Sequence, residues 1–152
     1  GERLLAGPDA EPSLGALHQQ MGAAAISLGR YEEAVDHLTL AIEHGPELIG
    51  SHYYRGVSLL SLGRYVEGVE DFTLSIEEGY LVQFCYYNRG VCHVNLLDYD
   101  SALDDMEMTL ESGDEQTLKD AATSILSQLP PSYESQHPLN CEQIQAEQIV
   151  EE

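Results

Sequence analysis

Histidine and cysteine are the residue types in this chain best suited to metal or nucleophilic chemistry, yet their spacing forms no known catalytic pattern. The six histidines are His18, His37, His44, His52, His93 and His137. They make no His-Glu-x-x-His pattern, and the chain has no Cys-x-x-Cys pair, glycine-rich phosphate loop or Gly-x-Ser-x-Gly elbow. We therefore expect no enzymatic activity, no cofactor and no bound metal.

Cys85 and Cys92 are seven residues apart. On one helix their Cα atoms would be separated by about 10 Å, at 1.5 Å per residue. A disulfide needs less than about 7 Å between Cα atoms. We therefore interpret both cysteines as small buried hydrophobes.

A more informative pattern pairs arginine with aspartate sixteen residues later. It occurs twice, as Arg55 with Asp71 and as Arg89 with Asp105. At the corresponding positions 34 residues before the first pair, Met21 and His37 replace both partners together. Joint replacement predicts that the two residues touch, and we interpret each pair as a structural ion pair in which loss of one partner is costly.

The elements that position these residues follow from an internal repeat. MGAAAISLGRYEEAVDHLTLAIEHG begins at Met21, RGVSLLSLGRYVEGVEDFTLSIEEG at Arg55 and RGVCHVNLLDYDSALDDMEMTLESG at Arg89. The starts are 34 residues apart with no gap. The repeat units are predicted to span 15–48, 49–82 and 83–116.

Each unit contains two segments with helical periodicity, separated by a short break. In the second unit, Val69, Phe72 and Ile76 form the i, i+3, i+7 stripe of a helix that follows the break Gly63-Arg64-Tyr65. Gly45, Gly79 and Gly113 stand where each second helix is expected to end. Each unit is thus a helical hairpin whose apolar face is covered only by stacking.

The repeat resembles the tetratricopeptide repeat, whose 34-residue signature contains A-x3-F in the second helix. The matching residues are Ala34-x3-Leu38, Gly68-x3-Phe72 and Ala102-x3-Met106. The resemblance implies an all-α fold, a right-handed α-solenoid of three hairpins. Gly68 in place of alanine, and Leu97 where the other turns have Gly29 and Gly63, depart from the pattern and are expected to weaken individual hairpins.

The segments outside the repeats have different compositions. Residues 117–129 place Leu118, Ala121, Ala122, Ile125 and Leu129 on one face, which predicts a C-terminal capping helix. Residues 1–14 are interpreted as a leader or the remnant of a preceding element, and 130–152 as an acidic polar tail. We expect residues 139–150 of that tail to pack on the solenoid.

The resemblance implies that the first helices line a concave groove that receives peptides. The residues expected on this groove are Gln19, Gln20, Tyr53, Tyr54, Val57, Phe84, Tyr87, Asn88 and Val91. None of them is charged. Family members that bind chaperone tails resemble one another in a clamp of lysines, asparagines and an arginine, whereas the matching positions here are Gln19, Ala23, Tyr54, Phe84 and Asn88. A co-chaperone of that type is disfavoured.

Composition limits the partners further. The chain has 27 Asp and Glu against 6 Lys and Arg, a formal net charge of −21. This balance disfavours nucleic acids and anionic membranes, and no apolar run reaches the ~20 residues that span a bilayer. The chain is expected to be a cytoplasmic scaffold that binds another protein or peptide. The alternatives are an assembly module that self-associates through its groove, tail or ends, or an accessory domain of a larger protein.

Overall fold

The computed structural model describes residues 11–131, which form seven helices and no strand. The helices are α1 (Leu14–Ser27), α2 (Tyr31–His44), α3 (Ser51–Ser61), α4 (Tyr65–Glu77), α5 (Val82–Asn95), α6 (Tyr99–Glu111) and α7 (Gln116–Gln128). The predictions for residues 1–10, for the tail from residue 132 onward and for packing of residues 139–150 lie outside the described residues.

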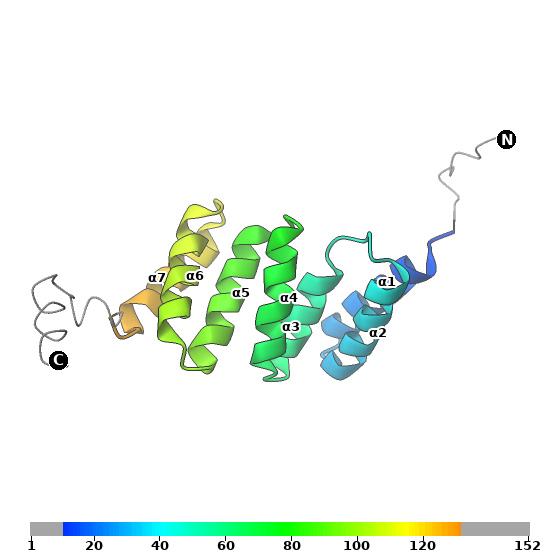
Figure 1. The fold of residues 1–152 in the computed structure, drawn as a ribbon, viewed down its shortest axis with the longest axis horizontal. Coiled ribbons are helices and arrows are strands. Elements are labelled where there is room, and N and C mark those ends of the chain that lie inside the picture. Colours follow the sequence, from blue (N-terminus) through cyan, green and yellow to red (C-terminus); the bar gives the residue numbers. More distant parts are fainter. Residues whose placement is uncertain (1–10, 132–152) are drawn as a thin grey trace, which may run out of the picture.

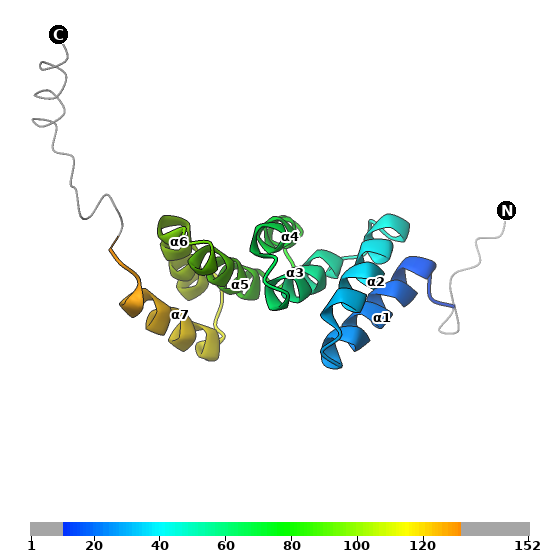
Figure 2. The same ribbon diagram turned by 90° about the horizontal axis from the view of Figure 1, so that it is seen from below.

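The first six helices form three antiparallel hairpins that follow one another along the long axis of the molecule (Figure 1). The second helices begin at Tyr31, Tyr65 and Tyr99, which preserves the 34-residue interval. In Figure 2, α1, α3, α5 and α7 lie on one side and α2, α4 and α6 on the other. This arrangement confirms the prediction of an all-α helical-repeat solenoid.

Each hairpin closes by placing one large side chain against a glycine. Leu38, Phe72 and Met106 on the second helices are all fully buried. A Cβ atom added at the facing glycine would lie 2.5 to 2.9 Å from the nearest atom of that side chain, in the pairs Gly22–Leu38, Gly56–Phe72 and Gly90–Met106. A first helix with any larger residue there could not approach so closely, which explains why glycine recurs at this position.

The turns inside the hairpins need a residue in the left-handed region. Gly29 and Gly63 have φ angles of +71° and +74°. Leu97 occupies the same position in the third hairpin with φ +61°, and its side chain is 70% exposed. Because a Cβ atom makes this conformation costly by about 1–2 kcal/mol, the third turn carries strain that the other two avoid.

Helix α7 packs on α6 and α5 at the end of the solenoid. Its fully buried residue is Ala122, while Leu118, Ala121 and Ile125 are half-buried. The apolar stripe seen in the sequence therefore faces the third hairpin.

Candidate functional site

The first charged site joins the two helices of the second hairpin. Arg55 Nε donates to Asp71 Oδ2 at 2.7 Å, and Arg55 Nη2 donates to Asp71 Oδ1 at 2.8 Å. The Asp71 side chain is 3% exposed and that of Arg55 is 23% exposed. The hydrogen bond to Asp71 raises the pKa of Arg55, with burial acting in the opposite direction. The guanidinium therefore stays charged, and its geometry is the bidentate one that strengthens such pairs.

The third hairpin repeats this geometry. Arg89 Nε donates to Asp105 Oδ2 at 2.9 Å, and Arg89 Nη2 donates to Asp105 Oδ1 at 2.7 Å. The guanidinium carbon also lies 5.4 Å from the centre of the Tyr86 ring, within cation–π range. Both arginines are thus engaged by groups of their own hairpin.

Each arginine also reaches back to the preceding hairpin, a contact that sequence reasoning missed. Arg55 Nη1 donates to Thr39 Oγ1 at 3.3 Å, and Arg89 Nη1 donates to Thr73 Oγ1 at 3.1 Å. The sequence contains a signal for this contact between hairpins, because each threonine precedes its arginine by sixteen residues, the same spacing that separates the arginine from its aspartate. The triplet therefore fastens successive hairpins to one another.

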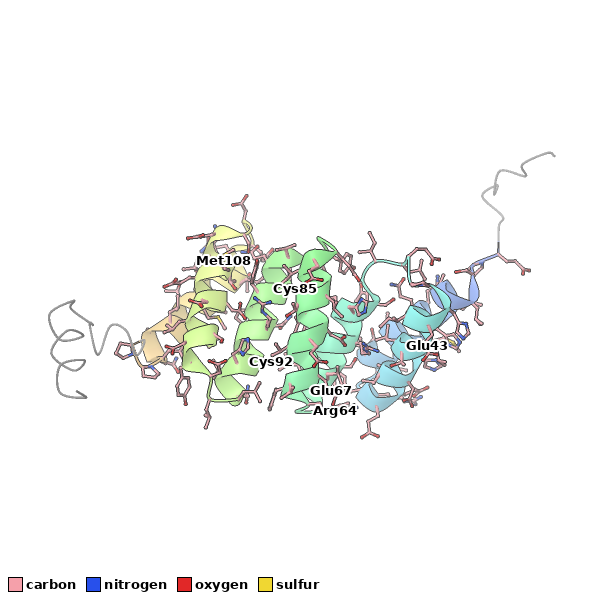
Figure 3. The ribbon with its side chains drawn as sticks, in the orientation of Figure 1. Glu43, Arg64, Glu67, Cys85, Cys92 and Met108 are labelled. Atoms are coloured by element: carbon pink, nitrogen blue, oxygen red, sulfur yellow. The ribbon has the colours of Figure 1, made fainter. Side chains whose placement is uncertain are left out.

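A pocket of about 170 Å³ lies beside the Arg55 triplet, between α2 and the second hairpin. It is lined by Val35, Thr39, Arg55, Leu59, Arg64, Glu67, Glu70 and Asp71. Arg64 and Glu67, labelled in Figure 3, are themselves joined by hydrogen bonds of 2.9 and 2.7 Å. In this lining Arg55 pairs with Asp71 and Arg64 pairs with Glu67. These four charges are therefore little available to a charged ligand.

The predicted groove residues of α5 share one face of that helix. Phe84, Tyr87, Asn88 and Val91 follow the i, i+3, i+4, i+7 pattern, and all four are half-buried. Cys85 and Cys92 of the same helix, labelled in Figure 3, are fully buried. The four residues of this α5 face are therefore partly exposed, and a ligand could contact them.

The structure brings residues of the second and third units together on this face. The Asn88 side chain lies close enough to the Tyr53 hydroxyl to act on its pKa. Burial raises the pKa of Tyr53, while the Asn88 side chain partly opposes that shift. A neutral hydroxyl and a carboxamide are thus held side by side, and the two groups can both donate and accept hydrogen bonds.

Tyr53 and Tyr54 also belong to the packing between hairpins. Tyr54 packs on the buried cluster of Ala25, Ala34 and Leu38 in the first hairpin. Tyr53 packs on a second cluster, made of Phe72, Cys85 and Cys92, and Val57 packs there as well. These rings contribute to both core and surface, so their removal would also loosen the solenoid.

Tyr80 completes this aromatic group, although it was not among the groove residues predicted from the sequence. Its ring centroid is 5.9 Å from that of Tyr53, and its hydroxyl is 3.2 Å from the Tyr54 hydroxyl. The hydrogen bond with Tyr54, together with burial, raises the pKa of Tyr80 to about 12. The phenols of Tyr53 and Tyr80 are therefore neutral at physiological pH.

The two glutamines predicted on the first unit have different surroundings. Gln19 Nε2 donates to the Ile49 carbonyl at 2.9 Å and to Ser51 Oγ at 3.0 Å, so its amide ties α1 to the start of α3. Gln20 is exposed. Gln20 is therefore the freer of the two for an external ligand.

The cysteines are unsuited to nucleophilic chemistry. Cys85 and Cys92 are free and fully buried. Burial raises the pKa of both thiols, that of Cys92 to about 12. Because the thiolate is the reactive form, both residues act as packing groups at neutral pH.

The described residues contain neither a cluster of metal ligands nor a membrane-spanning helix. Among residues 11–131, no group of three or more His, Cys, Asp and Glu side chains is placed to hold a metal ion together. None of the helices in that range combines the length and apolarity needed to cross a bilayer.

Solved structures provide the comparison with known proteins, since no protein-family model and no curated protein matches the sequence. An Arabidopsis OM64 TPR domain superimposes with a TM-score of 0.70 at 20% identity, covering 76% of this chain and 95% of that one. The first TPR of Spaghetti (RPAP3), bound to the HSP90 peptide SRMEEVD, gives 0.66 at 20% identity, covering 80% and 94%.

The second TPR domain of human RPAP3, in complex with the HSP70 peptide SGPTIEEVD, has a TM-score of 0.61 at 23% identity and covers 75% of this chain and 96% of that one. At such identities the likeness is one of fold, and it agrees with the 34-residue period and the helix pairs described above. The chain has the fold of a tetratricopeptide repeat domain.

Proposed function

We propose that this chain is a protein-interaction scaffold and that the face formed by its first helices binds an extended or helical peptide segment of another protein. The observation that carries the proposal is the partly exposed set Phe84, Tyr87, Asn88 and Val91 on one face of α5, with Tyr53 of α3 close to Asn88. Large aromatic side chains with polar neighbours are typical of binding hot spots. Solved domains of the same fold are bound to peptides, which supports this class of partner.

The peptide preference is expected to differ from that of those two domains. Both of their peptides end in the acidic sequence EEVD. In residues 11–131 of this chain, every Lys and Arg lies 3.8 Å or less from a carboxylate, in the pairs Arg30–Glu33, Arg55–Asp71, Arg64–Glu67, Arg89–Asp105 and Lys119–Asp114. A carboxylate-rich ligand would find each of these cations already paired.

A neutral or basic segment fits this face better. The expected groove residues are uncharged, and the net charge of the whole chain is −21. Long-range attraction therefore favours a basic peptide, while local contacts come from rings and amides. Gln20 and Asn88 can hydrogen-bond the backbone of such a segment through their carboxamide groups.

Selection of peptides from a random displayed library tests the proposal. We expect the purified chain to select peptides with aromatic or aliphatic anchors and zero or positive net charge, and to leave SRMEEVD unbound. Tyr87→Ser should weaken the selected peptides about tenfold or more, which corresponds to about 1.4 kcal/mol. Leu74→Ser, on the exposed side of α4, is the matched control and should bind normally.

Two outcomes of these experiments would contradict the proposal. Equal binding by Tyr87→Ser and the parent chain, with helicity retained by circular dichroism, would place the site elsewhere. Tight binding of SRMEEVD would contradict the argument from paired cations.

A further inference from the structure

Three histidines gather on one side of the first hairpin. His18 is on α1, and His37 and His44 are on α2. The Nδ1 atoms of His18 and His37 are 3.2 Å apart. The His18 ring centroid lies 5.5 Å from that of His37 and 6.2 Å from that of His44, with interplanar angles of 28° and 23°.

This group distinguishes the first hairpin from the other two. The position of His37 is held by Asp71 and Asp105 in the second and third hairpins, where each aspartate pairs with an arginine. His37 has Met21 in place of that arginine, and it faces His18 instead. The ion-pair site of the later repeats is thus converted into a pair of imidazoles.

The spacing of the two nitrogens suits a chelate. An ion bound tetrahedrally at 2.0–2.1 Å holds two imidazole nitrogens about 3.3 Å apart. In the metal-free protein one of the two Nδ1 atoms must carry a proton and donate it to the other, because two facing lone pairs repel. An ion bound to both nitrogens lies off the line that joins them, so it takes the place of the shared proton once the two rings tilt until their lone pairs converge.

A nearby carboxylate favours the required form of His37. Glu33 Oε1 lies 3.9 Å from His37 Nε2. At this distance the two groups are not hydrogen-bonded, but the negative charge favours the tautomer with the proton on Nε2, which leaves the Nδ1 lone pair to face His18. A carboxylate that accepts a hydrogen bond from that N–H orients a metal-binding histidine.

We propose that His18 Nδ1 and His37 Nδ1 form a site for a divalent transition ion such as Zn²⁺. Because residues 11–131 supply no ready group of three ligands, water completes the coordination, or the nearby His44 ring turns toward the ion. The net charge of −21 raises the local concentration of cations around the chain.

Thermal unfolding in a ZnCl2 series provides the first test. The full chain is prepared without a histidine tag and with His137→Gln and Cys141→Ser, so that ligands of the C-terminal segment do not contribute. An ion that binds the folded site raises Tm as its concentration increases. MgCl2 at equal concentration is the ion control, because Mg²⁺ prefers oxygen ligands and reports only general screening of the acidic chain.

A matched pair of variants locates the site. His18→Tyr copies the residue at this position in the third hairpin, Tyr86, and keeps an aromatic ring while removing the ligand nitrogen. It should abolish the rise in Tm produced by Zn²⁺. His52→Tyr makes the same change at the same position of the second hairpin, where His52 Nδ1 faces Glu78 Oε1 at 2.6 Å, and should preserve the rise.

Nitrogen NMR of the imidazoles tests the site without altering it. Addition of Zn²⁺ should shift the Nδ1 resonances of His18 and His37 and leave those of His52 and His93 in place. Unchanged His18 and His37 resonances would overturn the proposal, as would an equal rise in Tm with Mg²⁺ or in the His18→Tyr variant.

Discussion

The first hairpin and the two that follow it close by the same packing but are fastened by different chemistry. In all three, a large residue of the second helix fills the space left by a glycine on the first. In the second and third hairpins, a bidentate arginine–aspartate pair is added beside this contact. In the first hairpin, the arginine position holds Met21, which is 51% exposed.

The presence of the ion pairs in the second and third hairpins only indicates where these pairs act. Arg55 and Arg89 each extend a third hydrogen bond to a threonine of the preceding hairpin. Sixteen residues before Met21, where the later repeats have this threonine, the sequence has Leu5. The pairs therefore belong to the junctions between repeats as much as to the hairpins, and the packing against glycine is sufficient to close a hairpin.

The largest expected effect comes from breaking one junction pair. Asp71→Ala should lower the free energy of unfolding by about 2–3 kcal/mol, because Arg55 loses its partner in a poorly solvated position. Urea denaturation measures the change. Glu70→Ala removes an exposed carboxylate next to Asp71 and should change stability by less than about 0.5 kcal/mol.

The double variant Arg55→Met with Asp71→His gives the second hairpin the residues of the first. It should recover part of the loss caused by Asp71→Ala, because the unpaired guanidinium is gone. If the double variant were as unstable as the sum of the two single changes, the two residues would not be coupled.

A smaller effect is expected at the turns, where the third hairpin differs from the first two. Leu97→Gly should raise the free energy of unfolding by about 1 kcal/mol, because glycine adopts the left-handed region without strain and the exposed leucine side chain contributes little. Gly63→Ala, the reverse change in the second turn, should lower it by about 1 kcal/mol. A loss of stability in Leu97→Gly would show that the leucine side chain contributes more than the strain costs.

The smallest effect isolates the contact between hairpins. Thr39→Val removes the acceptor for Arg55 Nη1 but keeps the shape of the side chain, and should cost about 0.5 kcal/mol. Thr123→Val is the control, since the Thr123 hydroxyl donates to a backbone carbonyl four residues earlier, as Thr39 does, but Thr123 is exposed on α7, a helix that contains no arginine. Equal losses in the two variants by urea denaturation would assign the effect to that backbone bond instead.

The all-α repeat fold, with its 34-residue interval and two helices in each unit, followed from the sequence alone. This was possible because the signals are local: the apolar period and the glycines of the first two turns act within one repeat. The sixteen-residue spacing, with joint replacement by Met21 and His37, likewise identified which arginine and aspartate share a hairpin. Each of these inferences concerns residues of a single unit.

The contacts between units could be identified only in the tertiary structure. The sequence places Tyr53 and Tyr54 on a first-helix face, but the structure shows that both rings also pack into the junctions. In the structure the Gln19 amide also donates a hydrogen bond to Ser51 at the start of α3, and His18 lies next to His37. Periodicity fixes the face of its own helix on which a residue lies. How much of that face a neighbour covers depends on the distance and angle between helices, which the packing of the large buried side chains sets.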